Sequence, residues 1–200
     1  MCANISHSYE YGYTAGKLAA DWLNTNCSAS QTVACALLTK PQSLAVIDRA
    51  NGIIEGLREN CTFAQIAATK PYSDQASARE MTEQMMREHP KIRCIVGVSD
   101  MSILGAYDAL EAMNLLNEEM CLVGIDASAP VLKKIQEGTV IRGSVSQDTK
   151  GFAEVTIHAA IAAIQGNPLP ESSIKIEAVT MENVAAYLQA EAASHSTPAS

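Results

Sequence analysis

Residues 93–98 read Arg-Cys-Ile-Val-Gly-Val, and residues 120–125 read Met-Cys-Leu-Val-Gly-Ile. Both runs are apolar at consecutive positions and do not alternate, which is typical of strands that are covered by helices on both faces of a parallel sheet. The segment 100–114 between them has a helical period. These three segments therefore predict a strand-helix-strand unit.

Short apolar runs and longer helical periods also alternate along the rest of the chain. This pattern predicts an α/β fold with a parallel sheet and helices on both faces. The other expected strands cover residues 32–38, 61–68, 140–145 and 174–180. The other expected helices cover residues 43–59, 75–88, 129–137, 150–165 and 182–190, and an amphipathic helix over 13–24 precedes the first strand.

Composition limits the classes of function. The chain has 200 residues, of which 48% are hydrophobic, so it can build one large domain or two small ones. The formal charge of −8, without a basic run, argues against nucleic acid as a partner of this segment. No stretch approaches the roughly 18 consecutive apolar residues of a membrane span. The first residues lack a leader pattern, and we expect that Met1 is not the natural start.

The six cysteines show no Cys-x-x-Cys pair and no histidine at metal-ligand spacing. Cys35, Cys94 and Cys121 lie inside apolar strand-like runs. We therefore expect them to be buried free thiols that act as small hydrophobic side chains, and we expect no metal site. So many thiols favour a reducing compartment.

Sequence support for catalysis is missing. The chain contains neither of the glycine-rich phosphate-binding motifs. The segment Gly-Val-Ser-Asp-Met at 97–101 is the nearest match to a nucleophile elbow, but it lacks the closing glycine and is better explained as a helix cap. We therefore expect a protein that is not an enzyme and that has no cofactor.

Polar residues recur at the ends of successive predicted strands. The carboxyl ends of parallel strands meet at one edge of a sheet, which is where such sheets bind ligands. Charged and amide groups at that edge suit a hydroxyl-rich ligand, because each hydroxyl both donates and accepts. Each residue alone is also explained as a cap or turn former, but their recurrence favours a site. The predicted ligand-binding residues are Arg49, Tyr72, Ser73, Ser99, Asp100, Asp126 and Gln147.

Three motifs together resemble a known family. They are Ser-Asp-Met-Ser-Ile-Leu-Gly-Ala at 99–106, Val-Gly-Ile-Asp at 123–126 and Gly-Ser-Val-Ser-Gln-Asp at 143–148. They resemble the ribose-type periplasmic sugar-binding proteins (type I) and the related effector domains of LacI-type repressors. The resemblance implies two Rossmann-like lobes that close on a sugar.

The same resemblance assigns roles to single residues. It implies ligand contacts for Arg49, Ser99, Asp126 and Gln147, with Tyr72 or Ser73 near an aromatic position. Ser99 stands where these proteins often have asparagine, which shortens its reach. The aspartate that they usually carry before Ala15-Gly16 is absent, and Tyr11 and His7 lie nearby in the sequence.

The resemblance also implies that most of the amino-terminal lobe is missing. Residues 1–28 would be the last helical segment of that lobe, 29–147 the carboxyl-terminal ligand-binding lobe, 148–167 a helix that returns to the amino-terminal lobe, 168–190 the final strand and helix of the carboxyl-terminal lobe, and 191–200 a disordered tail. Helices 13–24 and 150–165 would then have lost their sheet. We expect them to pack on each other and on a second copy of the chain, as a homodimer, or on upstream sequence.

Two classes of function follow from the resemblance. The first is binding of a monosaccharide as the solute-binding component of an ABC-type sugar transporter, with a permease or chemoreceptor as partner. Such a protein is periplasmic or extracytoplasmic if the parent carries a leader. The alternative is the effector-sensing domain of a LacI-type transcription regulator in the cytoplasm. An enzyme of flavodoxin-like build ranks third because no catalytic constellation is present.

Overall fold

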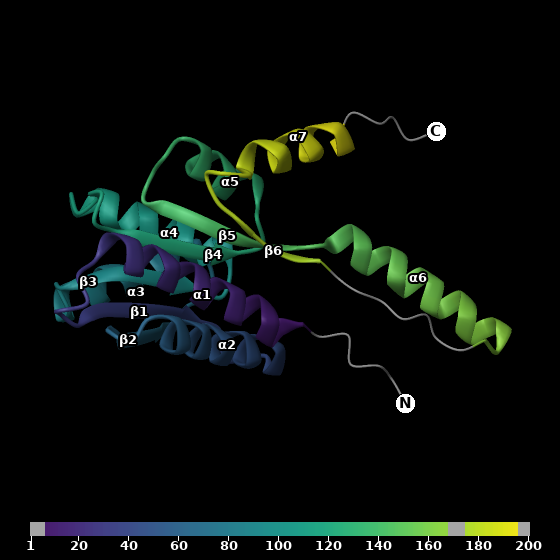
Figure 1. Ribbon diagram of the computed structural model, residues 1–200, viewed down its shortest axis with the longest axis horizontal. Coiled ribbons are helices and arrows are strands. Elements are labelled where there is room, and N and C mark those ends of the chain that lie inside the picture. Colours follow the sequence, from purple (N-terminus) through teal and green to yellow (C-terminus); the bar gives the residue numbers. More distant parts are fainter. Residues whose placement is uncertain (1–6, 168–174, 196–200) are drawn as a thin grey trace.

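The computed structural model describes residues 7–167 and 175–195. Its strands are β1 (Val33–Thr39), β2 (Ala64–Pro71), β3 (Ile92–Gly97), β4 (Cys121–Ile125), β5 (Ile141–Gln147) and β6 (Ile176–Val179). They form one six-stranded sheet in the order β2-β1-β3-β4-β5-β6 (Figure 1). The order reverses between β1 and β3, which makes the carboxyl end of this pair the switch point of the sheet.

Helices cover both faces of this sheet. The helices of the described residues are α1 (Ser8–Asn26), α2 (Leu44–Asn60), α3 (Gln75–Glu88), α4 (Asp100–Ala112), α5 (Ala129–Gln136), α6 (Thr149–Gln165) and α7 (Val184–His195), and all of them except α6 lie against the packed layers. Helices α1 and α2 pack side by side against the sheet, and α3 and α4 form a second pair. The predicted α/β class is confirmed.

The core lies along β3 and β4, as their consecutive apolar residues predict. Every residue of β4 is buried. Cys35, Cys94 and Cys121 are register partners on β1, β3 and β4, and all three are buried free thiols, as expected. They are not isolated from one another, because Cys94 is within hydrogen-bonding reach of both of the other two thiols. The contact with Cys94 and burial raise the pKa of the Cys35 thiol. The contact with Cys121 and burial raise the pKa of the Cys94 thiol, although the contact with Cys35 acts to lower it.

The expectation that helix 13–24 has lost its sheet is wrong. Helix α1 packs closely on α2 and also contacts β3 to β6. Ala15, Ala19 and Leu23 on this helix are fully buried. Residues 8–26 therefore belong to the same packed layers as the lobe assigned to 29–147. Glycines allow the close approach, since a Cβ on Gly52 would lie 2.2 Å from the carbonyl oxygen of Tyr9.

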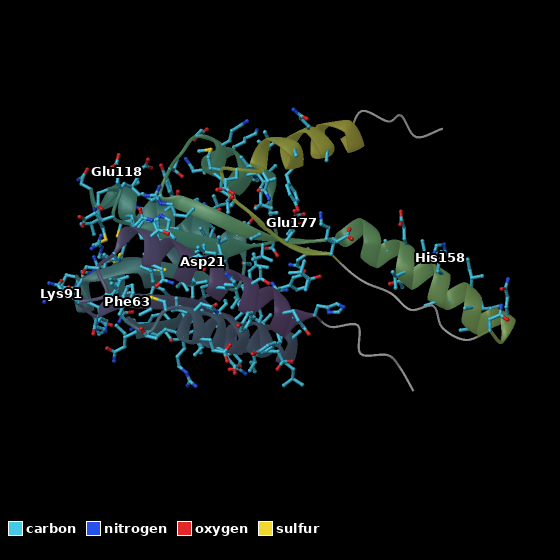
Figure 2. All side chains as sticks on the ribbon, viewed as in Figure 1. Asp21, Phe63, Lys91, Glu118, His158 and Glu177 are labelled. Carbon is cyan, nitrogen blue, oxygen red and sulfur yellow. The ribbon has the colours of Figure 1, made fainter. Side chains whose placement is uncertain are left out.

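Helix α6 differs from all the others because it runs away from the sheet and not along α1 (Figure 1). The expected pairing of helices 13–24 and 150–165 with each other is therefore wrong within this chain. Figure 2 shows His158 on α6, away from the packed layers. In the described residues, no helix combines the length and the apolar character that a membrane crossing requires.

The carboxyl-terminal part departs from the prediction in two ways. Strand β6 pairs antiparallel with β5, so the sheet is not parallel throughout. The reason is that the chain leaves β5 into α6 and returns at the same edge, which reverses its direction. Helix α7 extends to His195, so residues 191–195 are helical and not a disordered tail, as suits their alanine content. Residues 196–200 lie outside the described part.

Candidate ligand-binding site

Residues from three elements meet at the carboxyl edge of the sheet. Asp126 follows β4, Gln147 ends β5 and Arg49 lies in the second turn of α2. The Gln147 amide donates to the Asp126 carboxylate, and Arg49 Nη1 lies 3.8 Å from Asp126 Oδ1. The structure thus brings together three of the residues that the strand-end argument singled out.

Arg49 is held in place without being fully paired. Its Nη1 donates to the Val98 carbonyl at 2.8 Å, and its guanidinium lies 5.9 Å from the centre of the Tyr11 ring. The side chain is only 14% exposed. Among the described residues, its buried Nε has no hydrogen-bond partner. Buried donors are nearly always paired, so the unpaired Nε–H is a polar group of this cluster whose hydrogen bond is missing.

Asp126 is poised between opposing influences. Burial raises the pKa of its carboxyl group, while Arg49, the Asp100 amide, Gln147 and Lys40 act to lower it. Its backbone has φ 128°, and the next residue, Ala127, has φ 50°. Residues other than glycine rarely take such values, and they concentrate at functional sites.

Tyr72 and Ser99 form a second pair at this edge. The Tyr72 hydroxyl and Ser99 Oγ are 2.6 Å apart, and the tyrosine is only 3% exposed. Lys40 Nζ lies 4.8 Å from the centre of the Tyr72 ring. Sequence reasoning missed Lys40, although the residue directly follows β1 and the strand-end rule therefore applies to it.

Two predicted ligand residues have other partners in the structure. Ser73 is exposed and bonds through its amide to Ser77 Oγ at 2.9 Å, in the capping box that Asp74 forms at the start of α3. Asp100 is only 2% exposed and lies beneath the cluster. The expectation that Asp100 offers its side chain to a ligand is therefore wrong, because its carboxylate is occupied by neighbouring residues.

The partners of Asp100 are serines. Its Oδ2 accepts from the amide and the hydroxyl of Ser128, both at 2.7 Å, and its Oδ1 accepts from Ser144 Oγ at 2.6 Å. Burial raises the pKa of Asp100 to about 7, although these hydrogen bonds act to lower it. In the described residues, His, Cys, Asp and Glu side chains do not gather into a group that would hold a metal ion.

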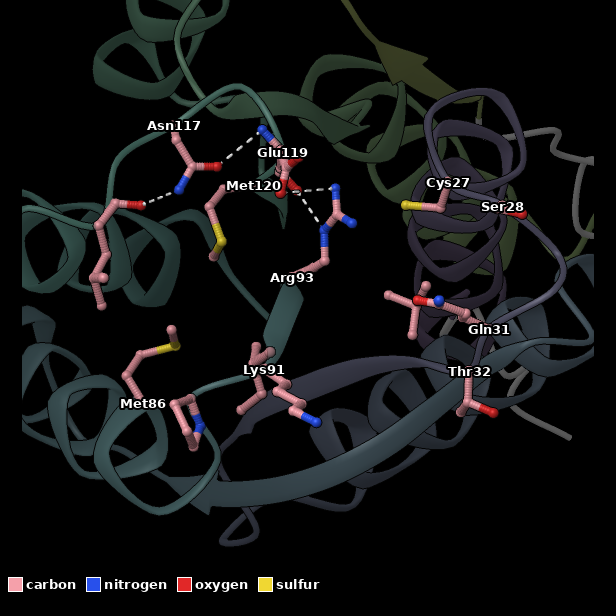
Figure 3. A pocket seen from close by; sticks show the side chains of 14 residues that line it. Cys27, Ser28, Gln31, Thr32, Met86, Lys91, Arg93, Asn117, Glu119 and Met120 are labelled. Atoms are coloured by element: carbon pink, nitrogen blue, oxygen red, sulfur yellow. Dashed lines mark hydrogen bonds and ion pairs between the residues drawn. The ribbon is translucent and has the colours of Figure 1, made fainter.

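A pocket of about 420 Å³ lies at the opposite edge, near the amino ends of β1 and β3 (Figure 3). Arg93 on its wall is already engaged, with Nη2 3.4 Å from Glu119 Oε2. Cys27 and Met120 also line this pocket. It contains none of the residues that the sequence predicts for ligand binding, so it is separate from the cluster around Asp126.

Comparison with known proteins supports this fold. Residues 4–168 match the family described as "Periplasmic binding protein domain". No curated protein matches the chain.

Solved structures show the same architecture. A solute-binding protein of an ABC transporter from Bacillus halodurans C-125, with bound myo-inositol, is 26% identical, with a TM-score of 0.78 over 91% of this chain and 61% of its own. A periplasmic solute-binding protein from Actinobacillus succinogenes 130z, with bound D-allose, is 19% identical, with a TM-score of 0.79 over 90% of this chain and 62% of its own. A Mycobacterium smegmatis protein in complex with β-D-fucofuranose is 22% identical, with a TM-score of 0.81 over 94% of this chain and 62% of its own.

The chain therefore spans less than two thirds of the length of these solved proteins. Their folds agree with the sheet order and helix layers described above. Because the family match extends over most of the chain and the fold agrees with it, the chain belongs to the periplasmic binding protein domain family.

Proposed function

We propose that the chain supplies the carboxyl-terminal half of a sugar-binding site, in the solute-binding component of an ABC-type transporter. The observation that carries the proposal is the cluster of Arg49, Asp126 and Gln147, in which Arg49 Nε has no hydrogen-bond partner among the described residues. The solved relatives described above carry D-allose, myo-inositol or β-D-fucofuranose, all of them rich in hydroxyl groups.

The chemistry of the cluster suits such a ligand. The Asp126 carboxylate accepts from two adjacent hydroxyl groups, and the Arg49 guanidinium donates to the oxygens beside them. The Gln147 amide can donate to one ligand hydroxyl and accept from another. The ligand is bound and released unchanged, because the cluster holds no activated nucleophile.

The setting of this site follows from the family. Its solved relatives are solute-binding proteins of transporters, which favours the transporter hypothesis over a transcription regulator. We infer an extracytoplasmic location and a membrane permease as partner. The amino-terminal lobe would close over the sugar from the other side and cover α6.

A titration with sugars tests the proposal. The chain is titrated with myo-inositol, aldopentoses and aldohexoses while backbone amide shifts are followed by NMR. At least one sugar should shift the amides around Arg49, Asp126 and Gln147 and not those around Arg93 at the opposite edge. Replacing Arg49→Gln should weaken binding roughly tenfold or more, as expected when a charged donor is lost.

The matched control is Arg79→Gln, which makes the same change at an exposed arginine on α3 that pairs with Glu83. It should leave the affinity unaltered. Equal affinity of Arg49→Gln and the unaltered chain, or shifts confined to the pocket beside Arg93, would contradict the assignment of the site.

A further inference from the structure

We propose that Asp100 is a positioning residue, whose buried carboxylate holds the turn at Asp126 and Ala127 in the conformation that presents Asp126 to the ligand. The part of this inference that concerns sugar affinity rests on the proposed function. The part that concerns the turn does not, because it follows from contacts within the chain.

The backbone conformation of this turn is unfavourable, so surrounding contacts are needed to hold it. Asp126 and Ala127 follow each other with φ values of 128° and 50°. Neither is glycine, so each side chain opposes the conformation it is held in. Conformations of this kind persist where surrounding contacts enforce them.

Asp100 contacts the residues that follow Asp126 in the turn. Its Oδ2 accepts from both the amide and the hydroxyl of Ser128, which fixes the residue after Ala127. Its Oδ1 accepts from Ser144 Oγ, and the same hydroxyl accepts from the Ala127 amide at 3.0 Å. One carboxylate therefore reaches Ser128 directly and Ala127 through one hydroxyl.

Backbone groups hold Asp126 itself, at the start of the turn. The Asp126 amide donates to the Val145 carbonyl at 2.9 Å, and the Asp100 amide lies 3.4 Å from Asp126 Oδ2. With the start and the end of the turn held, Asp126 Oδ1 faces Arg49 and Gln147. Loss of the contacts at Ala127 and Ser128 would free the Asp126 carboxylate to turn away from these two ligand-binding groups.

Strand β4 is built to admit the Asp100 carboxylate. A Cβ on Gly124 would lie 2.2 Å from Asp100 Oδ1, so a larger residue at this position would displace the carboxylate. Asp100 itself is only 2% exposed, which leaves no route for its side chain to contact a ligand. Its effect on binding must therefore act through the turn.

The test compares Asp100→Asn with Asp108→Asn, which makes the same change on the partly exposed side of the same helix. Hydrogen exchange of the Ala127 and Ser128 amides is measured without sugar, and sugar affinity is measured by the NMR titration. Asp100→Asn should speed exchange at these two amides roughly tenfold or more, because the asparagine side chain has one acceptor oxygen where the aspartate side chain has two. Exchange in β3 should stay as in the unaltered chain, affinity should fall by a similar factor, and Asp108→Asn should change neither.

Two further variants separate positioning from general stability. Ala127→Gly removes the side chain that opposes the left-handed conformation, so in the Asp100→Asn background it should restore part of the lost affinity. Ser144→Ala keeps Asp100 but removes the bridge to the Ala127 amide, and it should reproduce the faster exchange if Asp100→Asn fails to fold.

Unchanged exchange at Ala127 and Ser128 in both Asp100→Asn and Ser144→Ala would overturn the proposal. A loss of affinity that Ala127→Gly does not relieve would also overturn it, since the defect would then lie elsewhere. If the unaltered chain binds no sugar while the exchange results are as expected, the proposed function fails and the hold of Asp100 on the turn stands.

Discussion

Asp100 and Asp126 carry carboxyl groups at neighbouring strand ends. They differ in how deeply they are buried, and therefore in the role that each can have. Asp126 lies at the surface of the cluster beside Arg49, whereas Asp100 lies beneath it among serine hydroxyls. Burial opposes the ionisation of both and raises both pKa values. Asp126 has a cationic partner and remains available to a ligand, while Asp100 has three donors that are all part of the fold.

The raised pKa of Asp100 makes stability depend on pH. Burial raises this pKa from 3.8 to about 7, so the folded state binds the proton more tightly than the unfolded state does. The resulting stabilisation is complete below pH 3.8 and is lost as the pH rises through about 7. Each pKa unit corresponds to about 1.4 kcal/mol, so the free energy of unfolding should fall by a few kcal/mol from pH 4 to pH 8.

Urea unfolding across this pH range measures the effect. Asp100→Asn should flatten the decrease but not abolish it, because the pKa of Asp126 is raised in the same direction. Arg49, which lowers the pKa of Asp126, stays in place in this variant. A free energy of unfolding that rises between pH 5 and pH 7.5, or a slope that Asp100→Asn leaves unaltered, would show that the Asp100 carboxyl does not behave as described.

Helices α1 and α2 contact each other backbone to backbone, and glycines make this possible. A Cβ on Gly16 would lie 2.2 Å from the carbonyl oxygen of Ile53, and a Cβ on Gly52 would come equally close to that of Tyr9. The two glycines lie on facing sides of the pair. Because α2 carries Arg49, the spacing of these helices also sets the position of the ligand-binding guanidinium.

Gly52→Ala should therefore destabilise the protein although alanine is the better helix former. The added methyl group must push α1 and α2 apart, and overpacking of this kind costs about 1–3 kcal/mol. The gain in helix propensity offsets at most about 1 kcal/mol. Chemical unfolding of this variant is compared with that of Asn51→Ala, an exposed neighbour on the same helix, which should change stability by less than about 0.5 kcal/mol. Stability equal to that of Asn51→Ala would mean that the two helices do not need their close contact.

At the scale of the whole molecule, α6 stands apart from the packed layers. Ile157, Ile161 and Ile164 on this helix are 58%, 46% and 87% exposed. Full burial of such a side chain is worth about 1.5–3 kcal/mol, so together they form an apolar surface that favours a partner. In a longer protein the amino-terminal lobe would provide that partner.

A chain of residues 1–200 should therefore self-associate through α6. Sedimentation velocity should show a concentration-dependent shift from monomer to dimer or larger species. Replacing both Ile161→Glu and Ile164→Glu should return the chain to monomer, because charges oppose burial of this face. Gln165→Glu adds a charge at an exposed position of the same helix and should leave association in place. A monodisperse monomer at high concentration, with α6 intact by circular dichroism, would contradict this expectation.

The sequence pattern of each segment by itself determined the central strands and the edge of the sheet at which polar residues meet. Consecutive apolar residues at 93–98 and 120–125 predicted β3 and β4, because a strand that is covered on both faces needs no polar positions. The polar residues after successive strands predicted that Arg49, Asp126 and Gln147 meet, since parallel strands bring their carboxyl ends to one edge. These inferences need only the period of each element and the direction of its strand.

Only the tertiary structure decided which polar residues are available and which helices are covered. Asp100 and Asp126 follow strands in the same way, yet one is buried by Ser128 and Ser144 while the other faces Arg49. The contact of α1 with α2 and the antiparallel direction of β6 likewise depend on residues far apart in the chain. The periodicity of a segment records which of its faces is buried, but the depth of a side chain and the identity of its partner depend on the other segments that pack against it.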